Sequence, residues 1–232
     1  MISDQALEIL KIVFITFTTL FPIINPIGTS VIFLNLTEEA DHVLRKNIAK
    51  KIALNSILLM TFVLLFGTLI ISFFGISIPV IQFCGGAVIL AMGWKMLNNP
   101  DEDQMDKNKE SSVKPEIELG KMYKNKAFYP LTFPLTVGPG TFAVTLTLSA
   151  QYAKGNILTD FFSYFAAFIG MIALSISVYF FYANSDRLVA KFSRNLRRIF
   201  LRIISFILLC IGTEIVIMGL TSIIDRIIQN LS

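Results

Sequence analysis

Two short segments of this 232-residue chain combine residue types that are rare inside apolar runs: FPIINPIGT (21–29) and FPLTVGPGT (133–141). Each begins with Phe-Pro and ends with Gly-Thr, with five residues between that proline and that glycine. A proline removes a backbone N–H and clashes with the preceding helical turn, so each segment is expected to interrupt a helix. The backbone groups freed by such a break can bind the charged groups of a small ligand.

In the first segment, Pro22 predicts a helix end or kink at the adjoining Phe21. Asn25 and Pro26 suit a restart, with Asn25 as the N-cap and Pro26 at the first helical position. The segment closes on a glycine, which permits close backbone approach or a positive φ, and on a hydroxyl beside the break. These two residues are Gly28 and Thr29.

The second segment repeats this pattern one residue out of register. Pro134 predicts the end of the first helical piece, and Gly138-Pro139-Gly140 predicts the restart of the second. The hydroxyl groups near this break belong to Thr136 and Thr141.

The chemistry of the two breaks favours a zwitterionic ligand. A restarting helix presents its N-terminus, which favours an anionic group such as a carboxylate. The freed carbonyls suit an ammonium group or a small cation. Both segments therefore predict a substrate site for an amino acid; the alternative is that the prolines only kink membrane helices, and the matched pair favours the site.

Glu214 is the other candidate for chemistry, because it is the only acidic residue within a long apolar run near the C-terminus. A carboxyl group inside a membrane is costly and usually faces a cavity or a partner. We expect it to bind the substrate ammonium or to carry a coupling proton. The alternative is a protonated carboxyl that forms a hydrogen bond between helices.

The elements that must position these residues are membrane helices. The chain is 54% hydrophobic and only 16% charged, and its mean hydropathy of +0.69 lies above that of an ordinary soluble domain. Its uncharged runs are long enough to span a bilayer, and they lack the alternation of a transmembrane barrel. The expected fold is an all-α polytopic membrane protein with six spans, at 9–36, 47–74, 77–97, 127–150, 158–183 and 200–224.

Basic residues predict the orientation of these spans. Seventeen of the 20 Lys and Arg residues fall in the three loops that follow the first, third and fifth spans. Basic loops usually face the cytoplasm. We therefore expect these loops to be cytoplasmic and both termini to lie outside, in a multi-pass protein of the cytoplasmic membrane.

The two halves of the chain resemble each other. The two proline segments align at an offset of 112, and CGGAVILAMG (84–93) aligns with CIGTEIVIMG (210–219) at an offset of 126. Three spans per half make this a 3+3 inverted-topology repeat with discontinuous first and fourth helices, as in many secondary transporters. The predicted parts are 1–97, a polar cytoplasmic linker at 98–125, and 126–232.

Several function classes find no support in the sequence. Topology explains the positive charge, so no nucleic-acid partner is expected. No ligand cluster suggests a metal or another cofactor, and His42 is expected to be solvated. We expect Cys84 and Cys210 to be packing residues rather than a disulfide. No nucleophile–base pair predicts an enzyme.

Three stretches resemble the MarC/SnatA-like family of inner-membrane proteins: LFPIINPIGTSVIFLNLT, FCGGAVILAMGWKML and FYPLTFPLTVGPGTFAVTLTLSA. The resemblance covers essentially the whole chain. It implies six spans, and some members are described as transporters of neutral amino acids such as glycine and alanine. It also implies that the Asn25-Pro26-x-Gly28 and Gly138-Pro139-Gly140-Thr141 positions belong to the family motif.

The leading hypothesis is a secondary transporter that moves small neutral amino acids, such as glycine, alanine, serine or threonine, or similar solutes by alternating access. The alternative is a channel-like protein or an efflux protein for drugs and other small molecules. The physiological substrate, the coupling ion (proton or sodium), the direction of transport and a homo-oligomeric state are left open by the sequence.

Overall fold

The computed structural model describes residues 2–98, 122–123, 125–153, 155–191 and 194–231, and among these residues it contains helices and no strands. The expected linker at 98–125 lies almost entirely outside the described residues. The elements are α1 (Ile2–Ile24), α2 (Pro26–Leu36), α3 (His42–Phe73), α4 (Ile78–Asn98), the π-helix η2 (Ala127–Thr136), α6 (Pro139–Tyr152), α7 (Ile157–Ala183), α8 (Ser185–Lys191) and α9 (Arg194–Leu231).

The helices confirm a multi-pass membrane protein. Five of them are long and apolar enough to cross a bilayer, and the bent pair of η2 and α6 makes a sixth span if it is counted as one. The first expected span is divided into two helices. Ala6–Ile24 is long and apolar enough to cross a bilayer by itself, and α2 is a shorter apolar helix that follows it. Many large apolar side chains are exposed, as expected for surfaces that contact lipid.

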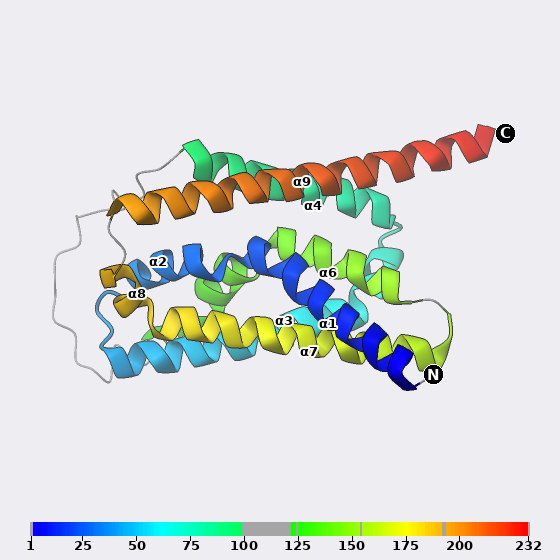
Figure 1. Cartoon of the computed structure of the whole chain (residues 1–232). Coiled ribbons are helices and arrows are strands. Elements are labelled where there is room, and N and C mark those ends of the chain that lie inside the picture. Colours follow the sequence, from blue (N-terminus) through cyan, green and yellow to red (C-terminus); the bar gives the residue numbers. More distant parts are fainter. Residues whose placement is uncertain (1, 99–121, 124, 154, 192–193, 232) are drawn as a thin grey trace.

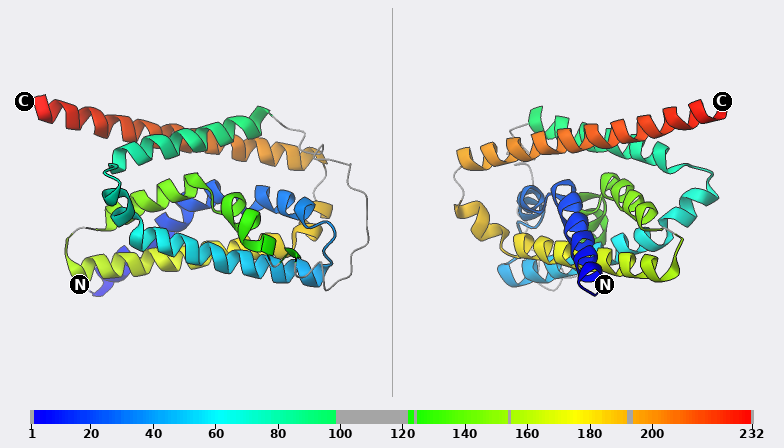
Figure 2. Two further views of the ribbon diagram at one scale, coloured as in Figure 1. Left: turned by 180° about the vertical axis from the view of Figure 1, so that it is seen from behind. Right: turned by 45° about the vertical axis from the view of Figure 1, so that its right-hand side comes forward.

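The helices form three layers (Figures 1 and 2). The pair α4 and α9 forms one outer layer, and the pair α3 and α7 lies on the opposite side. Between them lie the two interrupted helices, α1 with α2 and η2 with α6, which contact both outer layers. The breaks therefore occupy the interior of the bundle.

Both termini lie at the same end of the bundle (Figure 1). The α2–α3 connection and α8 lie at the opposite end, as an even number of crossings requires. The α3–α4 turn lies at the end with the termini, and Gly75 adopts a φ of 67° there, as expected for a glycine in a tight turn. Which end faces the cytoplasm stays a prediction from the basic loops.

Glycines hold α4 and α9 unusually close together. A Cβ atom placed on Gly86 would lie 2.9 Å from the carbonyl oxygen of Gly212, and one placed on Gly212 would lie 2.9 Å from that of Gly86. Real Cβ atoms essentially never approach a backbone atom so closely. The small-residue segments that the sequence repeats are therefore the contact surface between these two helices.

Candidate functional site

The first helix break is centred on Asn25. This residue adopts a left-handed conformation with φ 49° and ψ 61°, which asparagine tolerates better than most residues. Its side-chain oxygen accepts a hydrogen bond of 3.0 Å from the Gly28 N–H, and Pro26 opens α2. The predicted N-cap and restart are confirmed. Of the predicted end or kink near Phe21, the end lies three residues later, because α1 continues through Pro22 to Ile24.

Two neighbours complete this cap. A Cβ atom on Gly28 would lie 2.8 Å from Cγ of Asn25, so the cap requires glycine at this position. The Thr29 hydroxyl donates to the Asn25 carbonyl oxygen at 2.8 Å. Asn25 itself is only 4% exposed. The first break is thus closed by the Asn25 and Thr29 side chains of its own segment.

The second break is built differently. The chain leaves the helical conformation at Tyr129 and Phe133, and the peptide bonds that follow these two residues, to Pro130 and Pro134, are cis. After Val137 the axis bends by 68° into α6. The restart is confirmed, since Gly138 is the N-cap in an extended conformation and Pro139 follows it, but no side chain caps this helix.

Tertiary contact fixes the position of the second break. A Cβ atom on Gly140 would lie 2.6 Å from Cγ1 of Ile89 and 3.6 Å from Cγ2 of Ile23. Ile89 lies near the middle of α4, and Ile23 belongs to the last turn of α1. The start of α6 therefore packs against the end of α1, and the structure brings the two predicted segments together.

Tyr182 lies at the same place and was not anticipated from the sequence. Its hydroxyl is 2.9 Å from the Thr136 hydroxyl, its ring stacks on Phe33 of α2, and it is fully buried. The only signal in the sequence was a phenol in the last turn of an apolar helix. Nothing in a single sequence shows which helix face such a residue occupies.

Not every buried polar group of the bundle has a partner within the described residues. The Asn25 side-chain nitrogen is buried and makes no hydrogen bond there. The same holds for the hydroxyls of Ser56, Thr145 and Ser175, which belong to the neighbouring helices α3, α6 and α7. A buried donor without an acceptor costs free energy unless a ligand or water supplies one.

The other predicted site residues lie in several environments. Pro26, Gly28, Gly138 and Thr141 are buried, Thr29 is partly buried, and Pro134 and Pro139 are exposed. Glu214 lies on an exposed face of α9 and forms none of the hydrogen bonds or ion pairs found among the described residues. The structure therefore does not bring Glu214 together with the breaks.

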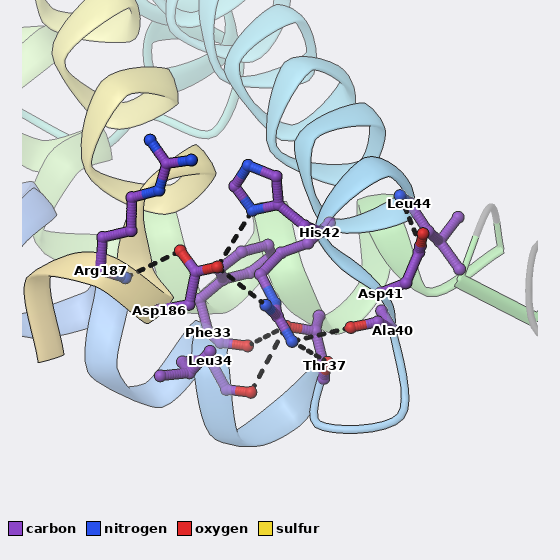
Figure 3. Close-up of polar contacts among 10 residues, drawn as sticks. Phe33, Leu34, Thr37, Ala40, Asp41, His42, Leu44, Asp186 and Arg187 are labelled. Carbon is purple, nitrogen blue, oxygen red and sulfur yellow. Dashed lines mark hydrogen bonds and ion pairs between the residues drawn. The ribbon is translucent and has the colours of Figure 1, made fainter. Parts of the chain in front are cut away.

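A polar cluster lies where α2 ends (Figure 3). Arg45 is buried and donates to the carbonyl oxygens of Thr37 and Ala40, at 3.1 and 2.8 Å. Asp186 of α8 lies 3.8 Å from the Arg45 guanidinium and 3.0 Å from Nδ1 of His42. His42 is thus only partly solvated, contrary to expectation, because its ring reaches across to α8.

The charges in this cluster act on Asp186. Partial burial opposes ionisation of its carboxyl group, but the Arg187 backbone N–H, His42 and Arg45 outweigh that effect and lower the pKa of Asp186 below its usual 3.8. The cluster therefore favours the ionised carboxylate, which ties the end of α2 to the segment after α7.

The described residues contain no group of three or more His, Cys, Asp or Glu side chains that could hold a metal ion. Cys84 and Cys210 are free thiols, and both are exposed on the outer faces of α4 and α9. They are not interior packing residues, because the glycine faces of these helices make the α4–α9 contact instead.

The family model described as "MarC family integral membrane protein" matches residues 10–224, from α1 through most of α9 and including both breaks. The chain belongs to the MarC family. It is 30% identical over 208 residues to UPF0056 membrane protein YvbG of Bacillus subtilis, which covers 88% of this chain and 92% of that protein. It is 25% identical over 218 residues to UPF0056 inner membrane protein MarC of Salmonella paratyphi A and of Escherichia coli O139:H28, covering 94% of this chain and 98% of each relative. No solved structure matches the chain.

Membership of the MarC family confirms the resemblance drawn from the sequence motifs. The names of these relatives describe membrane proteins and state no substrate. The chemistry of this MarC-family chain must therefore be inferred from its own residues.

Proposed function

We propose that this MarC-family protein is a secondary transporter for small neutral amino acids or similar zwitterionic solutes. The observation that carries the proposal is the buried, unpartnered Asn25 side-chain nitrogen, at a point where two interrupted helices meet inside a membrane protein. Irregular backbone at membrane depth is tolerated where it is buried in protein or lines a cavity. In transporters, such breaks form the substrate site.

The donors at the breaks suit a carboxylate. The Asn25 nitrogen can donate two hydrogen bonds, and α6 begins without a side-chain cap. The first N–H groups of an uncapped helix point outward along a dipole that favours negative charge. A carboxylate of a small amino acid would satisfy both sets of donors.

The acceptors at the breaks suit an ammonium group. Because Pro26 has no N–H, the Pro22 carbonyl lacks the donor that a continuous helix would supply four residues later. Pro139 likewise has no N–H, so the Leu135 carbonyl also lacks a donor four residues later. The two breaks thus offer donors for the carboxylate and acceptors for the ammonium group of a zwitterion.

The contacts between α4 and α9 support an inverted repeat. A Cβ atom on Gly93 would meet Ser205 and Leu209, whereas one on Gly219 would meet Pro79 and Phe83. Each residue in the first contact matches one in the second at the offset of 126. Reciprocal contacts between antiparallel helices are those of a pseudo-two-fold axis, which an inverted-topology transporter requires.

The test of the proposal is transport into liposomes that contain the purified protein. Labelled glycine, alanine, serine and threonine should accumulate, and unlabelled substrate on the opposite side should drive counterflow. Uptake without counterflow would instead indicate a channel, and proton and sodium gradients applied separately would identify the coupling ion. Absence of movement for every neutral amino acid under both gradients would refute the proposal.

One variant tests the carboxylate assignment. Asn25→Asp keeps an oxygen that can cap the Gly28 N–H but replaces the free nitrogen donor with an acceptor. We expect KM for amino acids to rise about tenfold or more, because a charged hydrogen bond is replaced by repulsion. An unchanged KM, with the protein folded, would remove Asn25 from the site.

Glu214, which lies away from the breaks on an exposed face of α9, enters the proposal separately, as the carrier of a coupling proton. Glu214→Gln should then abolish the dependence of uptake on a pH gradient while leaving counterflow intact. Normal gradient-driven uptake by this variant would eliminate the role of Glu214.

A further inference from the structure

Tyr182 of α7 contacts both interrupted helices. Its ring stacks on Phe33 of α2, with centroids 4.6 Å apart and an interplanar angle of 14°. Its hydroxyl lies 2.9 Å from the Thr136 hydroxyl at the end of η2. Thr29, beside the first break, lies four residues before Phe33 and thus on the same face of α2. One side chain thus links the two interrupted helices.

The hydroxyl groups of Thr136 and Thr29 already donate hydrogen bonds to backbone carbonyl oxygens. Thr136 donates to the Leu131 carbonyl oxygen at 2.7 Å, within its own broken helix. Thr29 donates to the Asn25 carbonyl oxygen at 2.8 Å. Toward Tyr182, each threonine oxygen is therefore left as an acceptor.

The phenol has one proton to donate to two acceptors. In this structure the short contact is with Thr136, so the phenolic proton points to the second break. A shift of the phenol toward Thr29 would transfer this hydrogen bond to the first break. Because Tyr182 is fully buried, water does not compete for the proton.

We propose that Tyr182 is a positioning residue that alternately holds the two helix breaks, by donating its single phenolic proton to Thr136 in one conformation and to Thr29 in the other. Stacking on Phe33 keeps the ring in place while the hydroxyl changes partner. The exchange makes closure of one break coincide with release of the other. It deepens the proposed transport function, because alternating access needs such a coupling between the two halves.

The experiment measures exposure of each break without any substrate. In a Cys84→Ser/Cys210→Ser background, Ile27→Cys reports on the first break and Leu135→Cys on the second; both positions are half-buried. The rate of reaction with a membrane-impermeant maleimide is measured in liposomes. This readout stays informative even if none of the tested amino acids proves to be a substrate.

The two threonine variants should act in opposite directions. Thr136→Val removes the acceptor at the second break, so Leu135→Cys should react faster and Ile27→Cys more slowly, each by about two- to tenfold for the loss of one hydrogen bond. Thr29→Val should produce the reverse pattern. Thr136→Ser and Thr29→Ser retain the acceptor and should restore the original rates.

Tyr182→Phe removes the donor and preserves the stacked ring, so both reporters should react faster. Tyr152→Phe is the matched control, because its hydroxyl also lies in a buried contact with a threonine, 3.2 Å from Thr16, away from the breaks. This control should leave both rates unchanged. The inference is overturned if the two threonine variants shift the reporters in the same direction, or if Tyr182→Phe behaves like Tyr152→Phe.

Discussion

The two helix breaks share a sequence pattern but are closed by different means. At the first, the side chain of Asn25 caps its own helix and Gly28 makes room for it. At the second, no side chain caps α6, and the packing of Gly140 against Ile89 fixes where the helix begins. The first break is therefore locally encoded, whereas the second depends on the tertiary structure.

This difference has a consequence for the proposed site. A self-capped break keeps its shape when neighbouring helices move, whereas a break held by packing can change when α4 moves. The N-terminus of α6, which no side chain caps, is also where the proposed ligand would find backbone donors. The second break is thus the better candidate for the part of the proposed site that moves during transport.

The largest effect should follow from filling the packed break. Gly140→Val places methyl groups where Ile89 already lies, so we expect a loss of about 2–3 kcal/mol in the free energy of unfolding from overpacking. Thermal unfolding of the detergent-solubilised protein measures this loss. Gln151→Val, at an exposed position of α6, serves as the control and should change it little. Equal stability of both variants would contradict the role of packing.

A smaller effect should follow at the first break, with a local rescue. Gly28→Ala displaces the Asn25 side chain from its cap, and the loss of an N-cap costs about 1–2 kcal/mol. Adding Asn25→Gly should recover part of that loss, because glycine adopts the left-handed conformation and has no side chain to clash. Unfolding of the single and double variants measures the coupling. Strictly additive losses would show that the first break is not closed locally.

Loss of the threonine hydroxyl should destabilise the protein more at the second break than at the first. Thr136→Val should cost about 1 kcal/mol, because the Tyr182 hydroxyl and the Leu131 carbonyl both lose a partner. Thr29→Val should cost less, since the Asn25 carbonyl still accepts from the Thr29 backbone N–H at 2.9 Å. Chemical or thermal unfolding ranks the two variants, and the reverse order would count against this account of the breaks.

The smallest effect is a dependence of local stability on pH. It should be confined to the end of α2, in the first broken helix. The interactions that lower the Asp186 pKa stabilise the fold fully above the usual value of 3.8 and are lost as the pH falls through the depressed pKa. Acidification from pH 6 to pH 3 should thus loosen the end of α2 more than α6, as hydrogen exchange would show. Asp186→Asn should remove that difference, and Asp225→Asn, exposed on α9, should not.

Much of the fold and part of the site could be predicted from local signals. Uncharged runs place all the membrane helices, because a spanning segment must satisfy its own backbone and bury no charge. The restarts at Asn25-Pro26 and Gly138-Pro139 were predicted for the same local reason, since capping and proline geometry act within a few residues. The exact end of α1 could not be predicted from Pro22, because a proline can be accommodated inside a membrane helix.

The sequence could not predict which side chains point into the bundle and which point outward to lipid. In a soluble helix, polarity distinguishes the buried face from the exposed one, but lipid is as apolar as a protein interior. The sequence therefore gives no sign that Tyr182 points inward between the breaks, or that Cys84 and Glu214 point outward. These residues acquire their roles only through helix pairing.

What the sequence by itself determined is the set of membrane helices, their two interruptions and the family motif, because each depends on hydrophobicity and backbone chemistry over short distances. Only the tertiary structure decided that the start of α6 packs on the end of α1, that Gly86 meets Gly212, and that the Tyr182 side chain contacts both interrupted helices. Those contacts join residues that are far apart in the chain, and shape complementarity between apolar surfaces selects them.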